Sequence, residues 1–218
     1  IVALMTQARE QITIYYNTGD GSFEEETVLN FDAVNGTSYF ELADFNADGH
    51  QDIMVTNGDN RDFSAIDKPY HGIRIFLNDG NASFKESFFY PMYDCGKAMV
   101  RDFDNDGDLD IIVNNLLAPA QLFENQLCGG DSLVLNLTWR GVENGDAVGA
   151  IAIIETSNGR YLRELRSNSG YLSGDPPQLY FGFPQGTELL QLEIIWPDGE
   201  KSILRELTAN TTVTVERP

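Results

Sequence analysis

Nine residues near the middle of the chain, 102–110, combine alternating acidic side chains with a glycine. They read DFDNDGDLD and lead directly into the apolar run IIV at 111–113. Ca²⁺ takes about six to eight oxygen ligands in a flexible shell, and a glycine lets the surrounding loop turn sharply. We therefore expect a calcium loop with side-chain ligands from Asp102, Asp104, Asp106 and Asp110 and a backbone carbonyl ligand from Asp108.

The same pattern occurs a second time as DFNADGHQD at 44–52, again followed by an apolar run, IMV at 53–55. A single acidic run is usually a solvated turn. Two copies that share the glycine, the phenylalanine at position two and the apolar exit favour two Ca²⁺ sites instead. The ligands expected in this first loop are Asp44, Asn46, Asp48, Asp52 and the backbone carbonyl of His50.

The residues that follow each loop exclude an EF-hand. An EF-hand loop closes with a glutamate at position twelve and continues as a helix. Position twelve is Val55 in the first loop and Val113 in the second. Both exits are short and rich in β-branched residues, which is typical of strands. Each ion is therefore expected between two strands.

An internal repeat extends beyond the loops. Residues 12–23 align with 73–84, each as an alternating strand, a turn of the Asn-x-Gly type and a phenylalanine that opens the next strand. An abbreviated third copy occupies 120–126, and the two loops begin 58 residues apart. One repeat unit is thus about four short strands: one into the loop, one out of it, and a hairpin.

This unit resembles the FG-GAP or VCBS repeat, the calcium-loop blade of integrin-α-like β-propellers. The resemblance covers residues 1 to about 126 and implies the same calcium ligands in both loops. It also implies a partial propeller of two to three four-stranded blades, because closed propellers need about four to eight. The first repeat is incomplete, since residues 1–5 match the strand that leaves a loop. Upstream residues, or self-association through this blade, are expected to cover that edge.

A second region begins after residues 127–130, where the repeat stops. Turn signals separate seven expected strands at 132–139, 148–156, 160–166, 178–183, 188–196, 201–206 and 211–216. Closely spaced strands without helical periodicity predict a C-terminal β-sandwich. The strings RELRSNSGYLS at 163–173, LYFG at 179–182 and IIWPDG at 194–199 resemble the ASPIC/UnbV domain. The expected fold is all-β, with domains at 1–126 and 131–218.

Charge and composition limit the function. The chain of 218 residues carries 34 acidic and 14 basic side chains, a net charge of −20. This argues against nucleic acid as a partner, because its binding needs a basic surface. The sequence contains no apolar run close to the roughly 20 residues of a membrane span.

Cysteines and glycosylation signals add weaker indications. Cys95 and Cys128 flank one repeat, and either a disulfide or two buried thiols would fit. Sequons for N-glycosylation occur at Asn35, Asn81, Asn136 and Asn210, more than the roughly two that chance predicts. Millimolar extracellular calcium suits loops of this type. Together these features favour a secreted, extracellular or cell-surface glycoprotein.

No catalytic constellation is evident in the sequence. Residues 167–173 are the most distinctive string of the second region, but a serine nucleophile needs a neighbouring base, and His50 and His71 belong to the first region. The sequence therefore predicts a secreted, calcium-binding, non-catalytic module for adhesion or assembly. Its expected partners are other proteins or extracellular polysaccharide. The alternative is a fragment of an extracellular carbohydrate-active or other enzyme whose active site lies on absent blades.

Overall fold

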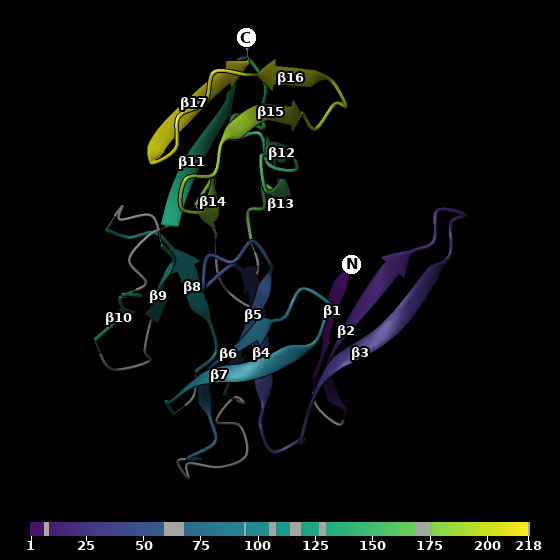
Figure 1. Cartoon of the computed structure of the whole chain (residues 1–218), viewed down its shortest axis with the longest axis vertical. Coiled ribbons are helices and arrows are strands. Elements are labelled where there is room, and N and C mark those ends of the chain that lie inside the picture. Colours follow the sequence, from purple (N-terminus) through teal and green to yellow (C-terminus); the bar gives the residue numbers. More distant parts are fainter. Residues whose placement is uncertain are drawn as a thin grey trace. The chain divides into compact units, whose positions relative to one another are not determined.

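A computed structural model describes residues 1–6, 9–58, 68–93, 95–104, 108–113, 119–126, 130–168, 174 and 176–217. The described residues form strands and turns without a helix, so the expected all-β class is confirmed (Figure 1). A helix with the length and hydropathy of a membrane span does not occur among them.

The chain divides into two compact units. The first unit contains residues 1–46, 50–100 and 110–124. The second unit contains residues 125–218 together with two short segments from the N-terminal half, 47–49 and 101–109.

Three antiparallel sheets, all of them wholly or mainly in the first unit, follow the order of the repeats. The first sheet contains β1 (Val2–Met5), β2 (Glu10–Asn17) and β3 (Phe23–Phe31). The second contains β4 (Thr37–Ala43), β5 (Asp52–Asn57), β6 (Gly72–Asn78) and β7 (Phe84–Pro91), in that order across the sheet. The third has β9 (Asp110–Val113) between β8 (Ala98–Arg101) and β10 (Gln121–Phe123). One repeat therefore corresponds to one sheet.

The hairpins β2–β3 and β6–β7 reproduce the aligned repeats in their backbone geometry. In the first, the Thr18 amide donates to the Ser22 carbonyl at 3.2 Å, and in the second the Asp79 amide donates to the Ser83 carbonyl at 3.1 Å. The glycine inside each turn has the same positive φ of 86°, a conformation that glycine adopts without steric cost. The alignment of 12–23 with 73–84 thus extends to the turn backbone.

The core of the first unit lies between its first two sheets. Apolar side chains that alternate along the strands meet there, among them Ile12, Leu29, Ile53, Val55 and Phe76. The Phe31 and Phe76 rings make an edge-to-face contact with centroids 5.8 Å apart. Period-two alternation in the sequence produces this arrangement, because successive side chains of a strand point to opposite faces.

Two sheets make up most of the second unit, and each of the seven expected strands is present. One sheet has β11 (Gly130–Trp139) between β14 (Gln178–Pro184) and β17 (Thr211–Arg217). The other contains, in order across the sheet, β13 (Gly159–Glu164), β12 (Ile151–Thr156), β15 (Leu189–Ile195) and β16 (Lys201–Leu204). The first and last of these strands along the chain, β11 and β17, pair in parallel.

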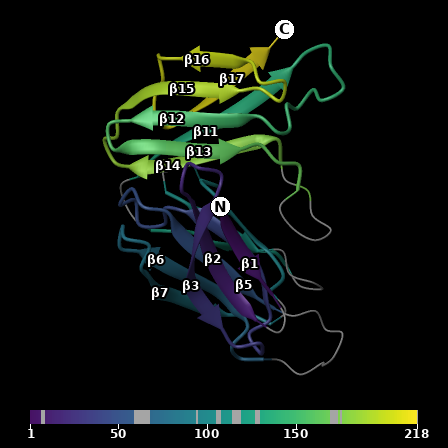
Figure 2. The ribbon, with the colours of Figure 1, turned by 90° about the vertical axis from the view of Figure 1, so that its right-hand side faces the viewer.

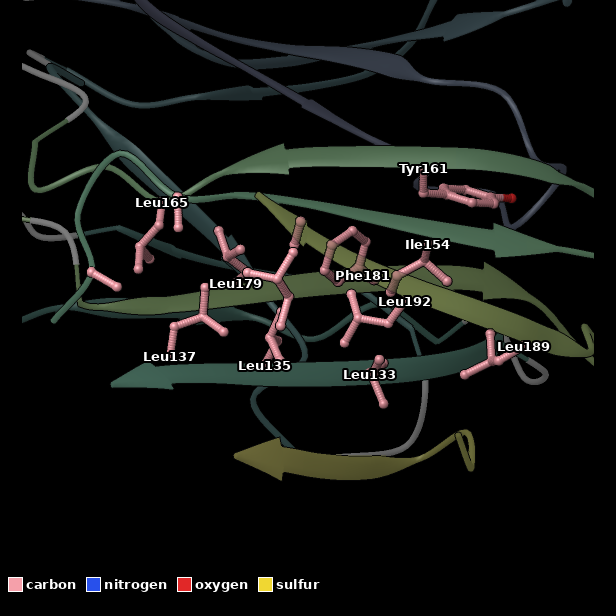
Figure 3. Close-up of a cluster of buried hydrophobic side chains, with 14 of the residues drawn as sticks. Leu133, Leu135, Leu137, Ile154, Tyr161, Leu165, Leu179, Phe181, Leu189 and Leu192 are labelled. Carbon is pink, nitrogen blue, oxygen red and sulfur yellow. The ribbon is translucent and has the colours of Figure 1, made fainter. Parts of the chain in front are cut away.

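The core of the second unit lies between these two sheets. Leu133, Leu135 and Leu137 of β11 point toward Ile154 and Leu192 of the other sheet (Figure 3). Burial of side chains of this size contributes about 1.5–3 kcal/mol each to folding. This cluster is therefore the main apolar stabilisation of the unit.

The C-terminal strand is fixed by an aromatic and ionic cluster. The Arg217 guanidinium lies 4.5 Å from the centre of the Trp139 ring and 5.6 Å from that of Trp196. It also donates to both carboxylate oxygens of Asp198, at 2.6 and 2.7 Å. These hydrogen bonds hold the pKa of Asp198 below its usual range. The two tryptophans are thus used for packing.

Candidate metal centre

Both acidic loops connect neighbouring antiparallel strands. Residues 44–52 join β4 to β5, and residues 102–110 join β8 to β9. In each case the last acidic residue of the pattern is also the first residue of the exit strand, Asp52 in β5 and Asp110 in β9. The pairing register of each sheet therefore fixes the position of one carboxylate in each loop.

The second loop gathers three of its predicted ligands. Carboxylate oxygens of Asp102, Asp104 and Asp110 all lie within 4.8 Å of one another. Asp102 and Asp110 are buried, whereas Asp104 is exposed. Asp108 is buried as well, with 5% of its surface exposed. Asp106 lies outside the described residues.

The Asp102 carboxylate is unusual in its surroundings. Only 7% of the residue is exposed, and neither of its carboxylate oxygens accepts a hydrogen bond from the described part of the chain. A buried ionised carboxylate without a compensating partner costs several kcal/mol. A divalent cation among three carboxylates removes that cost, and hard oxygen donors of this kind suit Ca²⁺. The residues present therefore fit a calcium ion held by Asp102, Asp104 and Asp110.

The first loop shows how the carboxylate at position nine is held. Its Asp52 is completely buried, and both oxygens accept backbone hydrogen bonds of 2.8 Å, from the amides of Phe45 and Asn78. Asp44 is buried, Asn46 is half-buried, and Asp48 is exposed. Gly49, at position six of the pattern, has a φ of 88°, which is the sharp turn that the glycine allows.

His50 occupies position seven of the first loop, where the backbone carbonyl is the predicted ligand. His50 is exposed, and its imidazole lies over the β6–β7 turn. A Cβ atom added to Gly80 would lie 2.8 Å from Nε2 of His50. The glycine of this turn therefore also provides the space that the imidazole occupies.

Two asparagines that the loop pattern does not include support the loops from outside. The side-chain amide of Asn78 donates to the Gln51 carbonyl at 3.0 Å, and that of Asn125 donates to the Leu109 carbonyl at 3.5 Å. Gln51 and Leu109 both occupy position eight of their loops. The sequence contains a signal for this contact, because an asparagine ends the aligned strand of each repeat. In the pattern of turn residues, that asparagine counts only as part of a hairpin.

The other predicted site residues lie apart from the loops. Four sequon asparagines fall within the described chain: Asn35, Asn81, Asn136 and Asn210. Asn81 is exposed in the β6–β7 turn. The amides of Asn136 and Asn210 make hydrogen bonds with Gln178 and Asp131, at 2.8 and 2.9 Å. Glycosylation of all four stays a prediction.

The disulfide considered between Cys95 and Cys128 involves a residue, Cys128, that lies outside the described residues. Cys95 is a buried free thiol with 2% of its surface exposed. Burial raises the pKa of this thiol to about 12. The side chain is therefore a neutral thiol at physiological pH.

Comparison with known proteins agrees with the repeat and with the distinctive C-terminal strings. Residues 1–55 match the model of the FG-GAP-like repeat, and residues 141–218 match that of ASPIC and UnbV. The chain carries an FG-GAP-like repeat followed by an ASPIC and UnbV domain. The resemblance inferred from the sequence is thus confirmed for these two ranges, and FG-GAP-like repeats imply a propeller-like fold.

Three relatives share one name, cartilage acidic protein 1. The human protein is 30% identical over 172 residues, which is 72% of this chain and 24% of the relative. The mouse protein is 29% identical over the same length, covering 72% of this chain and 25% of the relative. The protein of Xenopus tropicalis is 33% identical over 105 residues, covering 46% of this chain and 16% of the relative. The chain spans about a quarter or less of the length of these relatives.

Proposed function

We propose that this FG-GAP-like and ASPIC/UnbV chain is a calcium-stabilised, non-catalytic module for binding or assembly outside the cell. One observation carries the proposal: the buried Asp102 carboxylate, which lacks a hydrogen-bond partner among the described residues, lies beside Asp104 and Asp110. A cation that satisfies such a group binds the folded loop and not the unfolded chain, and so it stabilises the fold.

Two further observations support a non-catalytic role outside the cell. The relatives are named for cartilage, a tissue rich in extracellular matrix, and for acidity, and this chain is also strongly acidic, with a net charge of −20. The carboxylates that gather in the second loop do so in a metal-ligand arrangement. Such a group serves an ion better than it serves proton transfer, because the cation favours the charged form of each carboxylate.

We also propose an architecture for the two units. The three sheets of the first unit are successive propeller blades, and the two C-terminal sheets form a β-sandwich. In the second and third blades the acidic loop joins the first two strands, β4 to β5 and β8 to β9. The shared geometry of the two hairpins and the single core between the two C-terminal sheets support this proposal.

Calorimetric titration of the chelator-treated chain with CaCl₂ tests the function. We expect two bound ions per chain and a higher melting temperature with calcium. The variant Asp102→Asn should lose one of the two ions. Arg205→Gln, at the residue after β16 in the second unit, is the matched control that should keep both. A titration without heat, together with a melting temperature that calcium leaves unchanged, would contradict the proposal.

A further inference from the structure

The strand β14 lies at one edge of the sheet β14–β11–β17 and has two different sides (Figure 2). Leu179 and Phe181 point into the core of the second unit (Figure 3). Because successive side chains of a strand point to opposite faces, Tyr180, Gly182 and Pro184 lie on the other side of β14. These three residues are half-buried, so other parts of the second unit cover them. We call this side of the strand the outward side.

The two ends of the second acidic loop lie on the outward side of β14. Residues 101–109 belong to the second unit, as β14 does. The Arg101 guanidinium lies 4.5 Å from the centre of the Tyr180 ring. A Cβ atom added to Gly182 would lie 3.5 Å from Cγ and Cδ1 of Leu109, so the leucine side chain packs against this glycine. Each contact therefore anchors one end of the loop on the sheet.

Both anchoring residues directly precede a predicted calcium ligand. Arg101 is followed by Asp102, and Leu109 is followed by Asp110, the two buried carboxylates of the metal-ligand cluster. The Leu109 carbonyl also accepts a hydrogen bond of 3.5 Å from the Asn125 side chain. Leu109 is thus held through its backbone and its side chain. Groups outside a metal site that hold its ligands in place tune its affinity for the ion.

The first acidic loop meets the same side of β14. Its residues 47–49 belong to the second unit. A Cβ atom added to Gly49 would lie 3.8 Å from Cγ of Pro184, the third outward residue of the strand. Tyr180, Gly182 and Pro184 thus each adjoin a residue of an acidic loop. Contact with the acidic loops is therefore what this side of β14 provides.

We propose that Tyr180 and Gly182 are positioning residues for the calcium site of the second loop. Tyr180 acts through Arg101, and Gly182 acts through Leu109. This proposal rests on the calcium binding proposed above. If docking of the loop on β14 places the ligands, bound calcium stabilises that docking by the same free energy, because coupling between two binding events is reciprocal. Calcium thereby also regulates how firmly the loop is attached to the C-terminal sheet.

An exchange of side-chain volume between positions 109 and 182 tests the proposal. Calorimetric titration with CaCl₂ measures the dissociation constant of the second site, which is the site that Asp102→Asn removes. Gly182→Val should raise this constant on the order of tenfold, because the valine methyl groups need the space that Leu109 occupies. Leu109→Ala should raise it by a similar factor, because the contact is lost. The double variant should restore it, because valine fills the space that alanine leaves. Gly182→Ala is the matched control and should leave it unchanged, since a Cβ at 3.5 Å makes an ordinary contact.

The other end of the loop is tested through Tyr180. Tyr180→Leu should raise the dissociation constant of the second site about threefold, because it removes the ring that the Arg101 guanidinium contacts. Tyr180→Phe is the matched control, because it keeps the ring and loses only the hydroxyl, which donates to Gln178 at 2.6 Å. This variant should bind calcium as the wild-type chain does.

The reciprocal effect is measured on β14 itself. Amide hydrogen exchange of residues 178–184 should be slower in CaCl₂ than in EDTA, and Leu109→Ala should reduce this difference. Circular dichroism in CaCl₂ checks that each variant is folded, and Leu109→Ala adds no atom to the packed site. An unchanged dissociation constant in Leu109→Ala, or a double variant no tighter than the single ones, would overturn the proposal and leave the proposed function intact. A wild-type chain that binds no calcium at the second loop would overturn both.

Discussion

Two buried carboxylates at different positions of the acidic pattern, Asp52 at position nine of the first loop and Asp102 at position one of the second, have different surroundings. In the first loop, Asp52 accepts backbone hydrogen bonds at both oxygens, from Phe45 and Asn78. In the second loop, both oxygens of Asp102 are buried without such partners among the described residues. The position-nine carboxylate of the first loop is therefore held by protein hydrogen bonds, while the position-one carboxylate of the second loop is buried without them in the described part of the chain. The two carboxylates should therefore respond differently to the removal of a metal ion.

Removal of calcium should have the largest effect. A site at 100 times its dissociation constant contributes about 2.7 kcal/mol to stability. For a chain of this size, each filled site should therefore raise the melting temperature by about 5–11 °C. Thermal melts with excess CaCl₂ and with EDTA measure the difference, and MgCl₂ is the control for ion selectivity. Identical melts in CaCl₂ and EDTA would mean that neither loop depends on an ion.

Asp52→Ala should have the next largest effect, and it should not require calcium. The substitution leaves the amides of Phe45 and Asn78 without their acceptor, and each buried unsatisfied donor costs about 1–3 kcal/mol. We expect the free energy of unfolding to fall by about 3–5 kcal/mol in urea titrations with EDTA present. Asp102→Ala in the same buffer should not lower it by more than about 1 kcal/mol, because the substitution removes a buried charge and no hydrogen bond to the described residues. Equal losses in the two variants would abolish the contrast between the loops.

Asp102→Asn should change sign with the buffer. In EDTA it removes a buried charge that lacks a partner, so stability should rise by about 1 kcal/mol. In CaCl₂ it removes a ligand, so stability should fall by about 1–3 kcal/mol. Asp52→Asn is the comparison variant and should destabilise in both buffers, because it weakens two backbone hydrogen bonds. Thermal melts of the two variants in the two buffers measure these changes. A lower stability of Asp102→Asn in EDTA would contradict the interpretation that Asp102 is a buried charge without a hydrogen-bond partner among the described residues.

The smallest effect compares the two hairpins. Gly19 and Gly80 share a φ of 86°, but a Cβ at Gly19 would meet no atom within 4 Å, whereas one at Gly80 would lie 2.8 Å from His50. Gly19→Ala should therefore cost about 1 kcal/mol, from the backbone conformation alone. Gly80→Ala should cost more, and adding His50→Ala should remove the excess. Urea unfolding of the two single variants and the double variant measures the coupling free energy between positions 50 and 80. A coupling free energy of zero would show that the imidazole of His50 moves aside.

Local sequence patterns predicted the parts of the fold that depend on neighbouring residues. Alternation and turn residues identified the strands on both sides of each acidic loop, the paired hairpins and all seven strands of the second region. Where the strand boundaries differ, they do so by one to three residues, and the largest difference is at a strand expected from residue 148 that begins at Ile151. The Asn144 side chain holds both the amide and the carbonyl of Val148, at 3.0 and 2.8 Å, and Gly149 has a φ of 93°. These features bend the chain before the strand can start.

Contacts between distant residues could not be predicted from the same patterns. Asp52 owes one of its hydrogen bonds to Asn78, which is 26 positions away and is placed there by the register of β5 with β6. The pattern of acidic residues carries no information about that register, so this partner of Asp52 could not be predicted.

The parallel pairing of β11 with β17 determines how the second unit responds to mechanical force. The unit's first strand enters at one end of this pair and its last strand leaves at the other, with seven paired residues between them. A pull between Gly130 and Arg217 therefore slides the two strands along each other. All of the hydrogen bonds between them resist together, whereas strands pulled apart from one end separate one bond at a time. Under such a pull the domain would extend abruptly at high force, and only after the contacts of Arg217 with Trp139 and Asp198 had broken.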